Sequence, residues 1–156
     1  MLEVTITHTA DRTEIRLVGS IDHNSAQQFG KAFEGELRPT VSLNLKDVRS
    51  ISSYGVGLLL RHLSAISRQR KVEFAQCSET MVDQFQMLQF GHYGRITSFR
   101  ARYACPRCER TDEVMLDVAK LSVDRASRVV KSPDFPCACG GKLVVDDSLE
   151  FVIDHV

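Results

Sequence analysis

The sequence lacks the features that assign a chain to a specialised class of protein. Lys plus Arg and Asp plus Glu number 20 each, so no excess charge directs it to nucleic acid or a membrane surface. No apolar run approaches the roughly 18 residues of a transmembrane helix, and residues 1–14 lack the regions of a secretory signal. Internal repeats and low-complexity segments are also absent. We therefore expect a cytoplasmic globular protein.

Patterns of known catalytic centres are missing as well. The chain has no G-x-S-x-G, H-E-x-x-H or P-loop motif. Its histidines have no ligand or triad spacing; they are His8, His23, His62, His92 and His155. We expect a protein that is not an enzyme.

Cysteine is present, and its distribution is uneven. A cytoplasmic chain with five cysteines favours metal or redox chemistry over a disulfide framework. Cys77 stands alone at the end of an apolar segment, where a small buried side chain is expected. The other four cysteines lie in the last third of the chain. This asymmetry predicts two units, which we place at residues 1–99 and 100–156.

Residues 1–99 have the periodicities of an α/β domain. Alternating apolar residues predict a hairpin of strands over 2–7 and 14–19, and further strands over 41–45 and 71–77. Helical spacing predicts three helices, over residues 21–37, 53–66 and 78–91. In the first, Ser25 and Gln28 fit a capping box; in the third, Ser78 is the expected cap, Leu88 points inward and Gly91 ends the helix. The order predicts a mixed β-sheet with crossover helices, in which 41–45 is the central strand.

Two adjacent serines, Ser52 and Ser53, join the strand at 41–45 to the helix that follows. A single serine suffices to cap a helix, because its side-chain oxygen accepts one free amide, and Ser52 is the expected cap. A helix N-terminus also accommodates an anion, so a phosphoryl group on the second serine would disturb the fold little. If this surface binds a partner, the added charge would block the contact and leave the domain folded.

The segments "IRLVGSID" and "VSLNLKDVRSISSYGVGLLL" resemble the STAS domain, the fold of bacterial anti-sigma factor antagonists. The resemblance covers about residues 2–99. In such antagonists the loop is usually Asp-Ser-Ser-Gly or Asp-Ser-x-Gly, and the serine two before the glycine is phosphorylated. Counted back from Gly55, that serine is Ser53, while Ser52 stands in place of the aspartate and Tyr54 follows the phosphorylated position.

The resemblance implies a function in partner switching, a form of signal transduction that regulates transcription. The domain would bind a serine kinase that is also an anti-sigma factor, and phosphorylation of Ser53 would release it. Asp22, Ser52, Ser53, Tyr54 and Gly55 are then the partner-binding residues; Asp22 is equally well explained as the cap of the next helix. A STAS scaffold that is not phosphorylated is the alternative.

The four clustered cysteines predict a metal site. Cys105 and Cys108 form one close pair, Cys137 and Cys139 form another, and 28 residues separate the pairs. Two such hairpins bring four thiolates to one structural Zn²⁺ with no open coordination position. Apolar segments within 112–121, 142–147 and 149–156 predict about three strands, so residues 100–156 resemble a small β-rich zinc ribbon that the metal stabilises.

Alternatives remain open for this unit. The second pair is Cys-x-Cys where most ribbons have Cys-x-x-Cys, so His92 and His155 are candidate substitute ligands. A redox dithiol at Cys105 and Cys108 ranks lower, because no apolar helix follows the pair. A local basic run makes nucleic-acid binding a minor alternative; it comprises Arg95, Arg100, Arg102, Arg107 and Arg110.

Overall fold

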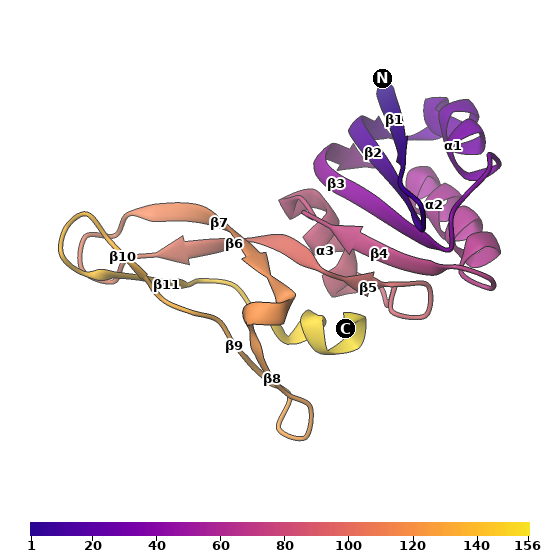
Figure 1. The fold of residues 1–156 in the computed structure, drawn as a ribbon. Coiled ribbons are helices and arrows are strands. Elements are labelled where there is room, and N and C mark those ends of the chain that lie inside the picture. The colour runs from indigo at the N-terminus through magenta and orange to yellow at the C-terminus, as the bar shows by residue number, and fades with distance from the viewer.

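The computed structural model describes residues 1–156, and its first region is a five-stranded sheet (Figure 1). The strand order is β1-β2-β3-β4-β5, with β1 and β2 antiparallel and the other neighbours parallel. The predicted mixed sheet with β3 at its centre is confirmed. The strands are β1 (Leu2–His8), β2 (Arg12–Ile21), β3 (Thr40–Ile51), β4 (Lys71–Ala75) and β5 (Arg95–Ile96).

Three helices cover one face of this sheet, namely α1 (Ala26–Phe33), α2 (Ser53–Ile66) and α3 (Glu79–Met87). Ile15, Leu43 and Phe74 are paired across β2, β3 and β4 and are fully buried on that face. The other face is polar; there Glu73 forms ion pairs with Arg12 at 3.1 Å and with Arg95 at 3.4 Å. None of the helices has the length and apolar content needed to cross a lipid bilayer.

Two details of the predicted helices are wrong. Ser25 makes no capping bond to α1; instead Asp22 and Ser25 form a capping box around the short 3-10 helix η1 (His23–Ser25). Helix α3 ends at Met87, four residues before Gly91, and Leu88 points outward with 41% of its surface exposed. The predicted caps Ser52 and Ser78 are confirmed, since each accepts a hydrogen bond from an amide of its helix.

The second region is a four-stranded antiparallel sheet of order β10-β11-β6-β7, with a separate two-stranded hairpin of β8 and β9. The prediction of a β-rich unit is confirmed. In Figure 1 this sheet extends away from the first one, and the loops that join its strands lie at the far end. Its elements are β6 (Ser98–Ala104), β7 (Thr111–Asp117), η2 (Val118–Lys120), β8 (Ser122–Asp124), β9 (Val129–Lys131), β10 (Phe135–Pro136) and β11 (Lys142–Val145).

The strand predicted over 149–156 is wrong, because residues Glu150–His155 form the 3-10 helix η3. Phe151, Val152 and Ile153 are all buried, a consecutive pattern that the alternation of a strand does not give. The helix packs against the first region. The Phe85 and His155 rings lie 5.3 Å apart, and the buried His155 accepts a hydrogen bond from the Phe90 amide at 3.0 Å. One contiguous apolar core therefore joins the two regions.

Candidate functional site

The tandem serines lie where β3 meets α2, and almost no loop separates the two elements. β3 continues to Ile51 and α2 begins at Ser53, so Ser52 alone connects them. Ser52 Oγ accepts the amide hydrogen of Gly55 at 3.1 Å, the expected cap. The Ser53 hydroxyl is exposed and makes no hydrogen bond within the chain. Ser52 is therefore the residue that caps the helix, whereas the hydroxyl of Ser53 is exposed and available for modification.

Gly55 fixes how closely α2 approaches the first sheet. A Cβ on Gly55 would lie 2.2 Å from the carbonyl oxygen of Ile21, so only glycine fits this contact. The amide of Ser52 donates to the same carbonyl at 3.0 Å. Both contacts bring the start of α2 beside Asp22, whose carboxylate accepts the Asn24 amide at 2.9 Å.

The predicted partner-binding residues therefore lie together around the N-terminus of α2. Tyr54 has 52% of its surface exposed, which is unusual for a large aromatic side chain. The first turn of α2 contains no acidic residue, so its free amides and dipole favour an anion. The capping role of Asp22 is confirmed, while its role toward a partner and the phosphorylation of Ser53 stay predictions.

A second pair of hydroxyls adjoins this surface and was missed by the sequence analysis. Ser50 Oγ donates to Ser20 Oγ at 2.8 Å, and the two residues face each other in the register of β2 and β3. Both positions precede the ends of their strands. Only the strand register brings them together, and no motif in the sequence signals it.

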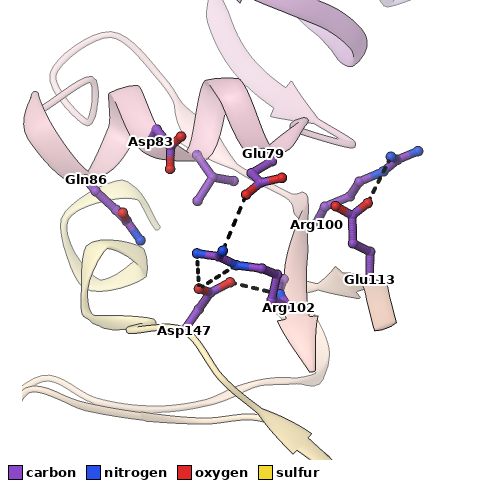
Figure 2. Close-up of a pocket in the computed structure, with 9 residues that line it drawn as sticks. Glu79, Asp83, Gln86, Arg100, Arg102, Glu113 and Asp147 are labelled. Carbon is purple, nitrogen blue, oxygen red and sulfur yellow. Dashed lines mark hydrogen bonds and ion pairs between the residues drawn. The ribbon is translucent and has the colours of Figure 1, made fainter. Parts of the chain in front are cut away.

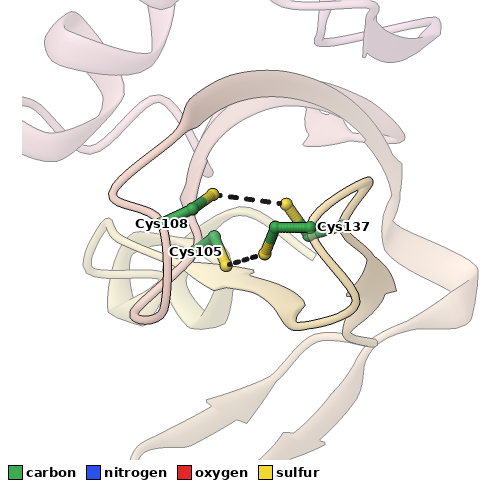
Figure 3. Close-up of side chains that lie close together, drawn as sticks. Cys105, Cys108 and Cys137 are labelled. Carbon is green, nitrogen blue, oxygen red and sulfur yellow. Dashed lines mark hydrogen bonds between the residues drawn. The ribbon is translucent and has the colours of Figure 1, made fainter.

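The four predicted metal ligands also lie together, at the end of the second sheet (Figure 3). All four sulfur atoms lie within 4.8 Å of one another. Cys105 Sγ and Cys139 Sγ are 3.6 Å apart, as are Cys108 Sγ and Cys137 Sγ. A tetrahedral ion with Zn–S bonds of about 2.3 Å separates its sulfur ligands by about 3.8 Å, so the cluster has the size of such a site.

Two tight turns produce this cluster. In the first, the Glu109 amide donates to the Cys105 carbonyl at 2.8 Å; in the second, the Gly140 amide donates to the Cys137 carbonyl at 3.0 Å. A Cβ on Gly141 would lie 3.1 Å from Cys105 Sγ and 3.3 Å from Cys139 Sγ. Glycine therefore leaves room for the sulfurs, and the short Cys-x-Cys turn reaches the cluster.

The histidines proposed as substitute ligands are not part of this group. Both ring nitrogens of His155 are used elsewhere: Nε2 accepts from the Phe90 amide and Nδ1 bonds the Phe151 carbonyl oxygen at 2.7 Å. The cysteines alone supply the ligand set. That set is closed, since four thiolates fill a tetrahedral ion.

The electrostatics of the thiols favour a bound cation. Amide hydrogens of Cys108 and Arg107 directed at the Cys105 sulfur lower the pKa of that thiol to about 6. At Cys139 the Gly141 amide lowers the pKa, but the cost of desolvation and the neighbouring thiols outweigh it and raise the pKa to about 12. Because the two thiols interact, these values belong to the pair and not to either residue alone. Four thiolates this close are therefore stable together only around a positive charge.

Comparison with known proteins gives one family. The family model described as Mlab, STAS domain, matches residues 4–98. The solved structure of the anti-sigma factor antagonist SpoIIAA in its unphosphorylated form is 25% identical, covers 62% of this chain and 87% of its own, and superposes with a TM-score of 0.45. The phosphorylated form of the Bacillus cell fate determinant SpoIIAA is 26% identical. It covers 62% of this chain and 90% of its own, and superposes with a TM-score of 0.43. No curated protein matches the chain.

Proposed function

Since the chain belongs to the STAS domain family, we propose that residues 1–99 form a regulatory module that binds a serine kinase with anti-sigma activity. Binding would involve the surface of Asp22, Ser52, Ser53, Tyr54 and Gly55. Phosphorylation of Ser53 would then end the contact and so regulate transcription in the cytoplasm of a bacterium. The proposal depends chiefly on one observation: the Ser53 hydroxyl is exposed and unbonded at a helix N-terminus whose cap is another serine.

The physics of the site supports a switch that leaves the fold intact. A phosphoryl group brings roughly −1.5 to −2 charges, and the free amides of α2 would stabilise it where it stands. The same charge beside the exposed Tyr54 would remain poorly solvated when a partner covers that surface. Phosphorylation would thus weaken binding with little change in the stability of the domain.

The test is the phosphorylation state of the protein isolated from its own cells. We expect intact-mass and fragment spectra to place one phosphate on Ser53. The variant S53A should lack it, and S52A, the matched control, should lose the cap and keep the phosphate. In a binding assay with the isolated kinase, S53A should bind constitutively and S53D should not. Equal binding by the two variants would contradict the switch.

The alternative function is that of a scaffold that is never phosphorylated. Ser52 favours it, because antagonists usually have an aspartate at that position. Absence of phosphate on Ser53 under all growth conditions, together with equal binding by S53A and S53D, would support this alternative.

For residues 100–156 we propose a zinc ribbon in which Cys105, Cys108, Cys137 and Cys139 hold one structural Zn²⁺. The size and closed ligand set of the cluster support zinc. A native mass spectrum should contain one zinc-sized increment that a chelator removes under denaturing conditions. Binding of nucleic acid by this unit is the weaker alternative, because four of the five arginines of the basic run already pair with carboxylates.

A further inference from the structure

A charged valley runs along α3 where the two regions meet. It consists of two adjoining hollows that share Gln86 and Asp147, and the larger has a volume of about 600 Å³. Figure 2 shows Glu79, Asp83 and Gln86 on α3, across the smaller hollow from Arg102 and Asp147. We call this surface the α3 valley. Its charged lining residues are Glu79, Asp83, Arg100, Arg102, Glu113, Arg128, Asp146, Asp147, Glu150 and Asp154.

Acidic groups outnumber basic ones in the α3 valley, although the whole chain is electrically balanced. Each of its arginines is already paired. Arg100 contacts Glu113 at 3.4 Å and Arg102 contacts Asp147 at 3.2 Å. Arg128 contacts Glu150 at 2.7 Å.

Two carboxylates of the valley have no ion-pair partner of their own. Asp83 on α3 and Asp146 after β11 are exposed and form no ion pair. The surface therefore presents unbalanced negative charge to solvent.

Apolar side chains lie at one end of the larger hollow. Met87 has 68% of its surface exposed and Leu88 has 41%, because α3 ends at Met87 and the chain turns Leu88 outward. Phe85 and Phe151 line the same hollow and are buried. Exposed methionine is typical of surfaces that adapt to different apolar partners.

We propose that the α3 valley binds a basic, amphipathic segment of a partner protein. Its apolar side chains would cover Met87 and Leu88, and its Lys or Arg side chains would pair with Asp83 and Asp146. Nucleic acid and anionic lipid do not fit, because their phosphates would be repelled by the same carboxylates. This surface shares no residue with that of Ser53, so its test does not depend on the proposed switch.

The experiment uses the full chain and a synthetic probe. The probe is a fluorescent peptide of about 14 residues, the length of an ordinary helix, made of Leu at helical spacing with Lys elsewhere. Anisotropy titrations near physiological ionic strength should give saturable binding. In the double variant D83K/D146K the affinity should fall about tenfold, since two exposed ion pairs with the peptide are lost and each contributes modestly.

Matched controls separate a specific site from general attraction. D11K/E36K changes the net charge equally at two exposed acidic residues outside the valley, and should alter the affinity less than twofold. M87Q should weaken binding severalfold. M115Q, at a methionine with 39% of its surface exposed on β7, should not.

Three results would overturn the proposal. The first is an equal loss of affinity in D83K/D146K and D11K/E36K. The second is equal binding of a peptide in which every Lys is replaced by Glu. The third is self-association of the free protein in sedimentation velocity that D83K/D146K removes, which would assign the surface to a second copy of the chain. Thermal unfolding of each variant verifies that the fold is intact.

Discussion

The two regions of the molecule are stabilised in different ways. In the first, three helices bury apolar side chains such as Ile15, Leu43 and Phe74 against a sheet. In the second, most residues of β7, β8 and β9 are exposed, and the four cysteines gather at the end of the sheet that is far from the first region. Apolar burial stabilises the first region and the part of the second that shares its core, such as Phe99 and Tyr103. At the cysteine end of the second sheet, a cross-link by metal is the expected stabilisation.

Loss of the metal is expected to give the largest contrast between the regions. Structural zinc contributes on the order of 10 kcal/mol to the folding of small zinc domains. In C137S, hydrogen exchange should therefore approach the unfolded rate in β7 and β11 and remain slow in β2 and β3. C77A is the matched control, because Cys77 is buried outside the cluster and the variant should retain zinc. Equal loss of protection in both sheets would contradict this division.

Helix η3 is one of the contacts that join the second region to the first. F151A removes the ring that packs against Phe99, and should lower the free energy of unfolding by about 3–5 kcal/mol. The zinc content should stay unchanged, since Phe151 lies outside the cysteine cluster. Chemical denaturation measures the first quantity and native mass spectrometry the second. A change below about 1 kcal/mol would mean that η3 is only loosely attached.

Within the first region, the glycines of α2 provide a paired test. G55A forces a methyl group against the Ile21 carbonyl and should destabilise the domain by about 1–3 kcal/mol. G57A places the same group where no atom lies within 4 Å, and should stabilise it by about 0.5–1 kcal/mol. Thermal unfolding of both variants gives the comparison. Similar effects at the two positions would show that the close contact with Ile21 does not hold α2 in place.

The smallest expected effect distinguishes the two serines. S52A should cost about 1 kcal/mol through loss of the cap on the Gly55 amide. S53A should change stability by less than about 0.5 kcal/mol, because its hydroxyl has no partner in the chain and surface substitutions of this kind are nearly neutral. Urea denaturation resolves the difference. A larger loss in S53A than in S52A would reverse the proposed division of roles.

The sequence allowed correct prediction of the elements whose periodicity is strong and local. The alternation along β2 and the central position of β3 are confirmed, as is the cap at Ser52. Grouping of the cysteines followed from their spacing, because two tight turns bring thiols together whatever lies between them.

Features that depend on tertiary contacts were missed. The segment Glu150–His155 was interpreted as a strand, since a short apolar run does not reveal whether it is packed on one side or on all. The predicted cap at Ser25 failed because Asp22 forms a competing box three residues earlier. The Ser20–Ser50 pair and the α3 valley arise from strand register and from the contact of the two regions. Neither the serine pair nor the valley produces a local pattern in the sequence from which it could be predicted.

The position of η3 has a consequence for how the protein is made. Phe85, Phe90 and Phe99 leave the ribosome well before Phe151 and His155, whose side chains pack against them. At roughly 5–20 residues per second, the nascent STAS domain waits on the order of seconds with this aromatic surface uncovered. During that interval it is open to chaperones and to other nascent chains, and packing of η3 ends the exposure.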